Sequence, residues 1–192
     1  MEDSLIELIP EGITQGVSLK EAFIVILREK DGKHGVPVLV SRNEYALVAQ
    51  AFSSKRGLSN RLPARILRKF GIRAEAVHLV YSRSMKVSAL LTLQRGDEHS
   101  SLALGVGEGI AFALENHCPL YALRSQFEAQ RSLQSVEGQF SLPIASMPSD
   151  LLREALRAAV ARDEFELAAA LRDQLAAKEK TEQEEARFLE NF

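Results

Sequence analysis

The stretch KEAFIVILREKDGKHGVPVLVSRNEYALVAQA, residues 20–51, decides the fold of the N-terminal part of the chain. Residues 22–28 form a nearly continuous apolar run rich in β-branched side chains, which predicts a buried strand. Residues 30–33 (KDGK) are typical of a hairpin turn, and residues 36–40 (VPVLV) predict the returning strand, with Pro37 at an edge or a strand start. Ser41 is a suitable N-cap for a helix over residues 43–52. The stretch therefore predicts a strand hairpin followed by a helix.

The same unit recurs 64 residues later. The two copies carry similar residues at matching positions: Gly32 and Gly96, Val38 and Leu102, Val40 and Leu104, Glu44 and Glu108, and Ala49 and Ala113. Self-similarity at a fixed spacing indicates a repeated structural unit. We interpret the pattern as duplicated strand-hairpin-plus-helix units with a pseudo-twofold arrangement. The alternative is a coincidence that any α+β domain can show.

The remaining segments complete an α+β fold followed by a C-terminal α-helical hairpin. We expect further strands at 4–9, 74–81, 87–93, 101–104 and 120–123, and further helices at 60–70 and 108–116. Gly, Pro and Ser cluster in residues 137–149, which is typical of a linker. Apolar residues then recur at helical spacing on either side of a turn at Asp163 and Glu164. We predict a domain at 1–135, a linker at 136–149 and a helical hairpin at 150–185.

The composition bounds the class of protein. The 192 residues are 46% hydrophobic and carry a net charge of −2, which is normal for a globular protein. The single cysteine, Cys118, forms no internal disulfide and fits a reducing cytoplasm. The N-terminus lacks the basic and apolar segments of a signal peptide, and no apolar run approaches the roughly 20 residues of a membrane helix. We expect a soluble cytoplasmic protein with no membrane partner.

The distribution of charge is more informative than its sum. No acidic residue lies between Glu44 and Glu75. On a helix from residue 60, Arg61, Arg65 and Arg68 share one face. Such a face could bind phosphates of a nucleic acid without sequence preference, or it could be a solvated helix surface. The candidate nucleic-acid-binding residues are Lys55, Arg56, Arg61, Arg65, Arg68 and Lys69.

Residues 20–51 and the stretch LALGVGEGIAFALENHCPLYA, residues 102–122, together resemble the bifunctional nuclease family over about residues 1–130. The shared features are the apolar strand, Glu29, Asp31-Gly32, Pro37, and the helix that opens with Glu44, followed by the second helix and its Pro-containing strand. The resemblance implies a metal-dependent nuclease of broad specificity for DNA or RNA, which associates as a homo-oligomer. Glu44 and Glu108 would be its catalytic residues and would hold Mg²⁺ or Mn²⁺.

The sequence departs from that family's second signature, Asp-x-Arg-x-Ser-Asp-Ala. Ala103, Gly105, Gly107, Glu108 and Gly109 stand at the five specified positions, so only a carboxylate is kept. The family's Arg-Pro-Leu-Thr-His-Asp segment reads Asn-Arg-Leu-Pro-Ala-Arg at residues 60–65, without the His and Asp. The departures favour an alternative, in which the domain is a catalytically weakened adaptor that binds nucleic acid or protein.

Residues 150–180, DLLREALRAAVARDEFELAAALRDQLAAKEK, resemble the UVR motif of bacterial excision-repair subunits and of some chaperone-linked regulators. The resemblance implies that the hairpin docks against the helical hairpin of another protein. Phe165 would plug the corner of the hairpin, and Ala168 and Ala169 would let its helices approach. The partner-binding residues it implies are Phe165, Glu166, Ala168, Arg172 and Asp173.

Each candidate site has a plainer interpretation. Glu44 and Glu108 could converge on a cation, or each could favour the dipole at the start of its own helix. The Gly-rich turn at residues 105–109 could cradle a phosphate, or it could reflect the repeat. The four histidines show no metal-ligand spacing. The sequence thus leaves two functions open: a nuclease with a protein-interaction hairpin, or a binding adaptor on the same fold.

Overall fold

The computed structural model describes residues 4–15, 22–30, 32, 35–53, 62–82, 86–129 and 147–190. The chain separates into two compact units, each of which is described by itself. The sheet unit comprises residues 1–14, 23–80 and 87–131. The second unit comprises residues 15–22, 81–86 and 132–192, and its helices form what we call the hairpin unit. The α+β fold with a C-terminal helical hairpin is confirmed.

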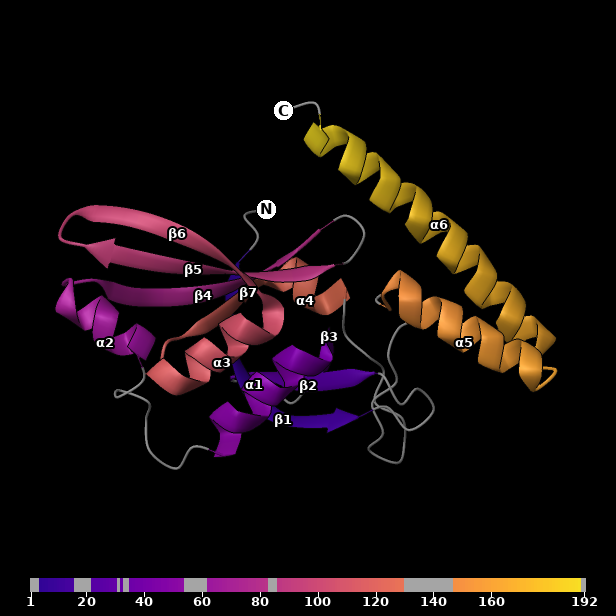
Figure 1. The fold of residues 1–192 in the computed structure, drawn as a ribbon, viewed down its shortest axis with the longest axis horizontal. Helices are drawn as coiled ribbons and strands as arrows, with labels where there is room; N and C mark the ends of the chain where they lie inside the picture. Colours follow the sequence, from indigo (N-terminus) through magenta and orange to yellow (C-terminus); the bar gives the residue numbers. More distant parts are fainter. Residues whose placement is uncertain are drawn as a thin grey trace. The chain divides into compact units, whose positions relative to one another are not determined.

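A seven-stranded mixed sheet forms the sheet unit (Figure 1). Its strands are β1 (Leu5–Gln15), β2 (Phe23–Glu29), β3 (Gly35–Val40), β4 (Arg73–Tyr81), β5 (Val87–Arg95), β6 (Glu98–Gly105) and β7 (Leu120–Leu123). Their order is β3-β2-β1-β7-β4-β5-β6. The hairpin pairs β2–β3 and β5–β6 are antiparallel, as is β1–β7, whereas β4 and β7 are parallel.

This order displays the duplication. From β7 towards one edge of the sheet the strands follow in the order β1, β2, β3. Towards the other edge they follow in the order β4, β5, β6. Helix α1 (Arg42–Ser53) follows β3, and α3 (Val106–Asn116) follows β6. Each copy therefore contains an antiparallel hairpin and a helix, as the 64-residue repeat predicts. Strand β7 belongs to neither hairpin and joins the two halves.

The core of the sheet unit lies between the sheet and the helices α1 and α3, which pack against each other (Figure 1). Strand side chains alternate between the two faces of a sheet. The registers put one set of buried aliphatic residues on the helix-covered face, including Leu8, Leu120 and Val77. From α3, Ile110 is fully buried.

Two elements, β1 and α4, differ from expectation, whereas α2 ends as expected. Strand β1 extends to Gln15 instead of ending near Ile9, but its burial alternates strictly only at the start. A short helix, α4 (Arg124–Ala129), follows β7 where none was predicted. Helix α2 (Leu62–Lys69) ends before Gly71, whose φ of 65° is the left-handed conformation that glycine adopts easily.

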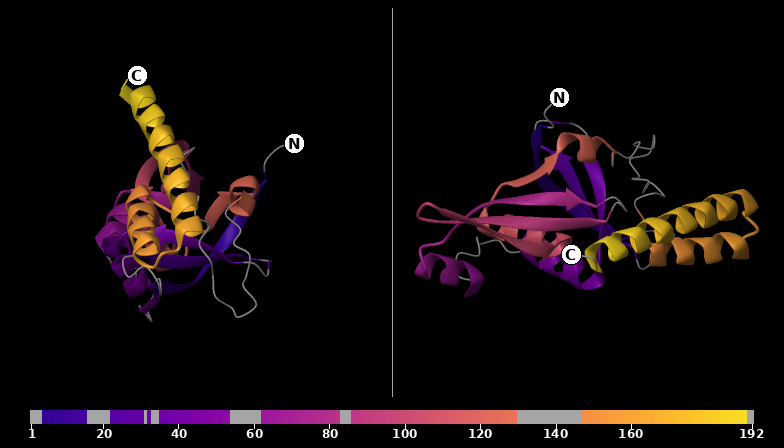
Figure 2. Two further views of the ribbon diagram at one scale, coloured as in Figure 1. Left: turned by 90° about the vertical axis from the view of Figure 1, so that its right-hand side faces the viewer. Right: turned by 90° about the horizontal axis from the view of Figure 1, so that it is seen from above.

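The hairpin unit consists of α5 (Ser149–Ala161) and α6 (Phe165–Glu190), which lie side by side as an antiparallel pair (Figure 2). Helix α5 begins at Ser149, inside the segment predicted as a linker; residues 136–146 of that segment lie outside the described residues. Helix α6 is twice as long as α5, so its last turns extend beyond its partner (Figure 2). The described helices include none that is long and apolar enough to span a membrane.

Candidate functional sites

The first turns of α1 and α3 meet, and they bring Glu44 and Glu108 together. Glu44 Oε2 accepts hydrogen bonds from the backbone N–H of Ser41 at 2.9 Å and from its hydroxyl at 2.8 Å. Glu44 Oε1 accepts the backbone N–H of Gly107 in the other copy at 2.9 Å. Glu108 Oε2 accepts the backbone N–H of Gly105 at 2.9 Å. Both glutamates therefore satisfy N–H groups that a helix start leaves without intrahelical partners.

The Gly-rich turn at residues 105–109 allows the close contact of α3 with its neighbours. A Cβ added at Gly107 would lie 2.3 Å from Glu44 Cβ, and one at Gly109 would lie 2.3 Å from Ala89 Cβ. A Cβ at Gly105 would lie 2.5 Å from Glu44 Oε1 and 3.3 Å from Glu108 Oε2. The glycines thus make room for α1 and β5. This packing accounts for the glycine pattern without a phosphate.

The chemistry available to this carboxylate pair follows from its partners. The Glu44 carboxylate lies at two helix N-termini, where its negative charge is stabilised by the N–H groups and the helix dipoles. A divalent cation takes six or more oxygen ligands. Within the described residues, no group of three or more His, Cys, Asp or Glu side chains is arranged to hold a metal ion. Glu44 and Glu108 are therefore placed as helix-capping groups, and two carboxylates are the protein ligands they would offer to Mg²⁺ or Mn²⁺.

The described part of the basic segment forms an exposed surface on α2. Arg65, Arg68 and Lys69 are exposed, as sequence spacing suggests. Arg73, at the start of β4, has a side chain that is 72% exposed. The other candidate nucleic-acid-binding residues, Lys55, Arg56 and Arg61, lie outside the described residues. We call Arg65, Arg68, Lys69 and Arg73 the basic surface. The spacing of the arginines indicated this surface, but nothing in the sequence linked Arg73 to a cavity.

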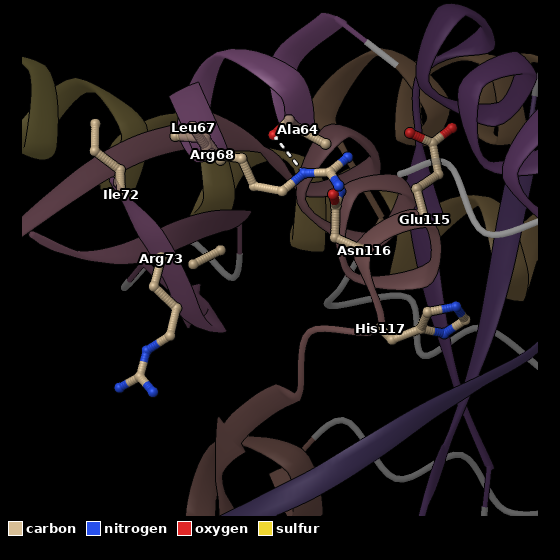
Figure 3. A pocket seen from close by; sticks show the side chains of 9 residues that line it. Ala64, Leu67, Arg68, Ile72, Arg73, Glu115, Asn116 and His117 are labelled. Atoms are coloured by element: carbon tan, nitrogen blue, oxygen red, sulfur yellow. Dashed lines mark hydrogen bonds between the residues drawn. The ribbon is translucent and has the colours of Figure 1, made fainter. Parts of the chain in front are cut away.

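An open pocket of about 670 Å³ lies beside the basic surface (Figure 3). Its lining comes from α2, from the turn into β4, and from the C-terminal end of α3; the lining residues are Ala64, Leu67, Arg68, Ile72, Arg73, Ala74, Glu115, Asn116 and His117. His117 closes α3 in the left-handed conformation, with φ 52°. Sequence reasoning missed this pocket, because its lining is brought together from two segments more than 40 residues apart.

Three other reactive side chains are held in unreactive states or on the surface. Burial lowers the pKa of His78, whose ring lies 5.7 Å from that of Tyr121. Burial raises the pKa of the Cys118 thiol to about 11, so the thiol is protonated at neutral pH. His99, on β6, contacts Glu75 at 3.1 Å and is exposed. Within the part of the chain that the structure describes, none of the three has the arrangement of a nucleophile with an adjacent base.

The hairpin unit is held together by an apolar seam. Along α6, Ala168, Leu171, Leu175 and Lys178 recur at the spacing of three and four residues that faces a partner helix, and all are buried or half-buried. Leu152 and Ala159 are the most deeply buried residues of α5. The small side chain of Ala168 therefore lies on the buried stripe of α6, which fits a close approach of the helices. The same prediction for Ala169 is wrong, because Ala169 is exposed.

Polar contacts fix the open end of the hairpin. Lys178 Nζ donates to the backbone carbonyl of Met147 at 2.8 Å, just before α5 begins. The Ser149 hydroxyl donates to Glu182 at 2.9 Å, and Arg153 pairs with Glu179 at 2.6 Å. Each contact ties the first turns of α5 to the middle of α6. Together with the seam they set the register of the two helices.

The closed end of the hairpin is a C-terminal capping motif at the expected turn. The N–H of Glu164 donates to the carbonyl of Ala159, and the N–H of Asp163 donates to that of Val160, which is the Schellman pattern. Asp163 adopts φ 58°, where glycine is usual and aspartate is tolerated. These backbone bonds close the corner. Phe165 does not plug it: the first turn of α6 directs this side chain outward, and 68% of the residue is exposed.

Most of the predicted partner-binding residues lie on the surface of the hairpin. Phe165 and Glu166 are exposed in the first turn of α6, and Val160 and Leu167 expose further apolar surface near the same end. Arg172 donates from Nε and Nη2 to the adjacent Asp173, at 3.0 and 2.8 Å. This exposed apolar end is the part of the hairpin that lacks cover within the described residues of its own unit.

Comparison with known families gives one match. Residues 150–181 match the UvrB/uvrC motif, UVR. The match covers both helices of the hairpin unit, and it confirms the C-terminal motif expected from the sequence. It makes the hairpin a protein-interaction or DNA-repair-related element. A comparison with curated proteins found no match to the chain.

Proposed function

We propose that this protein is an adaptor that binds a partner protein through its C-terminal hairpin and nucleic acid through its sheet unit. The observation that carries the proposal is the match of residues 150–181 to the UvrB/uvrC motif. The sheet unit is included because it has the basic surface. The resemblance of its sequence to the bifunctional nuclease family supports a nucleic-acid partner. The proposal includes a cytoplasmic location, since the half-buried thiol of Cys118 requires no oxidising compartment.

The partner of the hairpin would be a second helical hairpin. Two antiparallel helices expose apolar surface that a second pair can cover as a four-helix bundle. Val160, Phe165 and Leu167 supply that surface at the closed end, and the Arg172–Asp173 pair would lie at its polar rim. A second copy of this chain offers the same surface, so the proposal includes homo-oligomerisation.

The test of this partner uses the full chain and a purified protein that carries a UvrB/uvrC motif. Titration calorimetry is expected to detect a complex that Phe165→Asp weakens at least tenfold, because a charge would be buried at the apolar contact. Gln183→Asp, on the exposed far part of α6, adds the same charge and should leave binding unchanged. Equal binding by both variants would contradict the docking surface. Light scattering of the chain alone tests self-association, which a monomeric mass would exclude.

The nucleic-acid partner would be held by its phosphates. Arg65 and Lys69 lie one helical turn apart on α2, and both are exposed. The double variant Arg65→Glu/Lys69→Glu is expected to weaken binding of a labelled oligonucleotide at least tenfold. It should also reduce the slope of log K against log salt by about 2. Lys180→Glu, which reverses one positive charge on α6, is the control. Oligonucleotide binding that does not depend on salt, or that the double variant and Lys180→Glu weaken equally, would refute the role of this surface in binding phosphates.

A metal-dependent nuclease is the second candidate function. The observation that favours it is that the carboxylates of Glu44 and Glu108 both reach Gly105. Those two residues would hold Mg²⁺ or Mn²⁺, which would polarise a phosphodiester. The assay compares DNA and RNA cleavage with either cation and with chelator, beside Glu44→Gln and Glu108→Gln. Cation-dependent cleavage lost in both variants would establish the nuclease. If the protein cleaves neither DNA nor RNA but still binds them, the adaptor remains the proposed function.

A further inference from the structure

The pocket beside α2 has the size and lining of a small-ligand site. Its volume of about 670 Å³ lies within the range of roughly 300–1,000 Å³ that is usual for such sites. Leu67 and Ile72 give it an apolar side (Figure 3). Asn116 and His117 give it a polar side at the end of α3. A pocket with one apolar and one polar wall fits a flat ring that carries hydrogen-bonding groups on its edge.

The charges place an anionic group at one end of the pocket. Among the described residues of its lining, the charged side chains are Arg68, Arg73 and the acid Glu115, so their formal charge sums to +1. Arg73 Nη2 donates to Gln94 Oε1 at 2.6 Å, and the same nitrogen lies 3.5 Å from Glu75 Oε1. Within the described residues its Nε and Nη1 make no hydrogen bond, so the guanidinium keeps single donors, together with its charge, for a phosphate oxygen.

The other end of the pocket suits a neutral group. Helix α3 ends at Asn116, so its partial negative charge faces this side of the pocket. An anion would be repelled there, whereas amino and hydroxyl groups would be favoured. The phosphate therefore belongs beside Arg73 and the neutral ring beside Leu67 and Ile72.

We propose that this pocket binds a nucleoside phosphate, with the base between α2 and the end of α3 and the phosphate on Arg73. The ligand has two sources: a free nucleotide, or an unpaired nucleotide of a strand whose neighbouring phosphates lie along the basic surface. The second source rests on the proposed function, and the first does not.

The experiment uses the full chain and measures the binding of free nucleotides and of oligonucleotides. Calorimetry with adenosine and guanosine monophosphates is expected to give saturable binding, at least tenfold tighter than that of the nucleosides or of inorganic phosphate. Ala74→Leu fills the pocket from β4 and should abolish this binding. Arg73→Gln should weaken it at least tenfold, with Arg95→Gln, an exposed arginine at the end of β5, as the control. Unfolding in urea verifies that each variant is folded.

Oligonucleotides then separate the pocket from the basic surface. Single-stranded DNA is expected to lose at least fivefold in affinity in the Ala74→Leu variant, whereas blunt duplex DNA should bind both proteins equally. The proposal is overturned if wild-type protein binds no nucleotide, or if Ala74→Leu leaves nucleotide and single-strand binding intact. In the latter case binding of oligonucleotides would still support the adaptor. Nucleotide binding that Ala74→Leu removes, without any binding of oligonucleotides, would support the pocket and refute the nucleic-acid function.

Discussion

The first turns of α1 and α3 hold equivalent places in the two copies of the repeat, yet they pack by opposite means. In the first copy, the ring of Tyr45 of α1 packs against that of Phe23 of β2, with centroids 5.0 Å apart and planes tilted by 49°. The position 64 residues later is Gly109, and there α3 lies almost directly against Ala89 of β5. Large side chains separate one helix from the sheet, whereas the absence of a side chain lets the other approach. A duplicated backbone plan therefore does not require duplicated packing.

The N-caps differ in the same way. The Ser41 hydroxyl accepts the backbone N–H of Glu44 at the start of α1, and the Glu44 carboxylate accepts the backbone N–H of Ser41. The equivalent residue in α3 is Gly105, which has no capping side chain, and Glu44 of the other copy supplies an acceptor to Gly107 instead. One carboxylate thus serves both helix starts. This sharing breaks the symmetry of the repeat and makes the second copy depend on the first.

The largest expected effect is at Gly107. Gly107→Ala places a Cβ 2.3 Å from Glu44 Cβ and 3.1 Å from the backbone of α1, which cannot move aside cheaply. We expect a loss of about 3 kcal/mol in the free energy of unfolding, measured in urea. Asn43→Ala, the same position of the first copy, is exposed and should change it by less than about 0.5 kcal/mol. Similar losses in the two variants would mean that the copies pack alike.

Gly109→Ala should cost somewhat less, about 2 kcal/mol, because its added Cβ meets Ala89 Cβ, whereas the backbone of β5 lies farther away, at 3.8 Å. Ala89→Gly removes that obstacle. The double variant should therefore lose less stability than the sum of the two single changes, and the double-mutant cycle measures the difference. Simple additivity would show that α3 does not rest on β5 at this point.

Glu44→Ala is expected to lower the free energy of unfolding by about 2 kcal/mol, since it leaves helix-start N–H groups in both copies without their acceptor. Glu108→Ala removes one such bond and should cost about 1 kcal/mol. Urea unfolding of both variants tests the order. If Glu108→Ala is the more damaging, the sharing of Glu44 between the copies is wrong.

The smallest effect is expected at Arg42, whose guanidinium lies 5.4 Å from the centroid of the Phe23 ring. Arg42→Gln should cost about 0.5 kcal/mol through loss of this cation–π contact. In Phe23→Leu, which has no ring, the same change should cost less than it does in the wild type. An equal loss in the Leu background would show that the ring contributes nothing to the role of Arg42.

The sequence by itself determined most of the elements and their repetition, although not α4 or the length of β1. Alternating and β-branched runs have a period of two, and the stripes of α5 and α6 recur every three to four residues, so each is visible locally. The 64-residue spacing identified both hairpins, and the basic surface followed from the spacing of Arg65 and Arg68 on one helix. The motif at residues 150–181 was equally local, because its residues lie on one hairpin.

Only the tertiary structure decided where these elements meet. No local signal places β7 between β1 and β4, because strand order is set by packing of the whole sheet. The role of Glu44 at Gly107 and the reason for the glycines of α3 depend on the contact between α1 and α3. The nucleotide-sized pocket needs residues 64–74 and 115–117 side by side. Such contacts join residues that are far apart in the chain. Short-range sequence patterns carry no information about which distant residues meet.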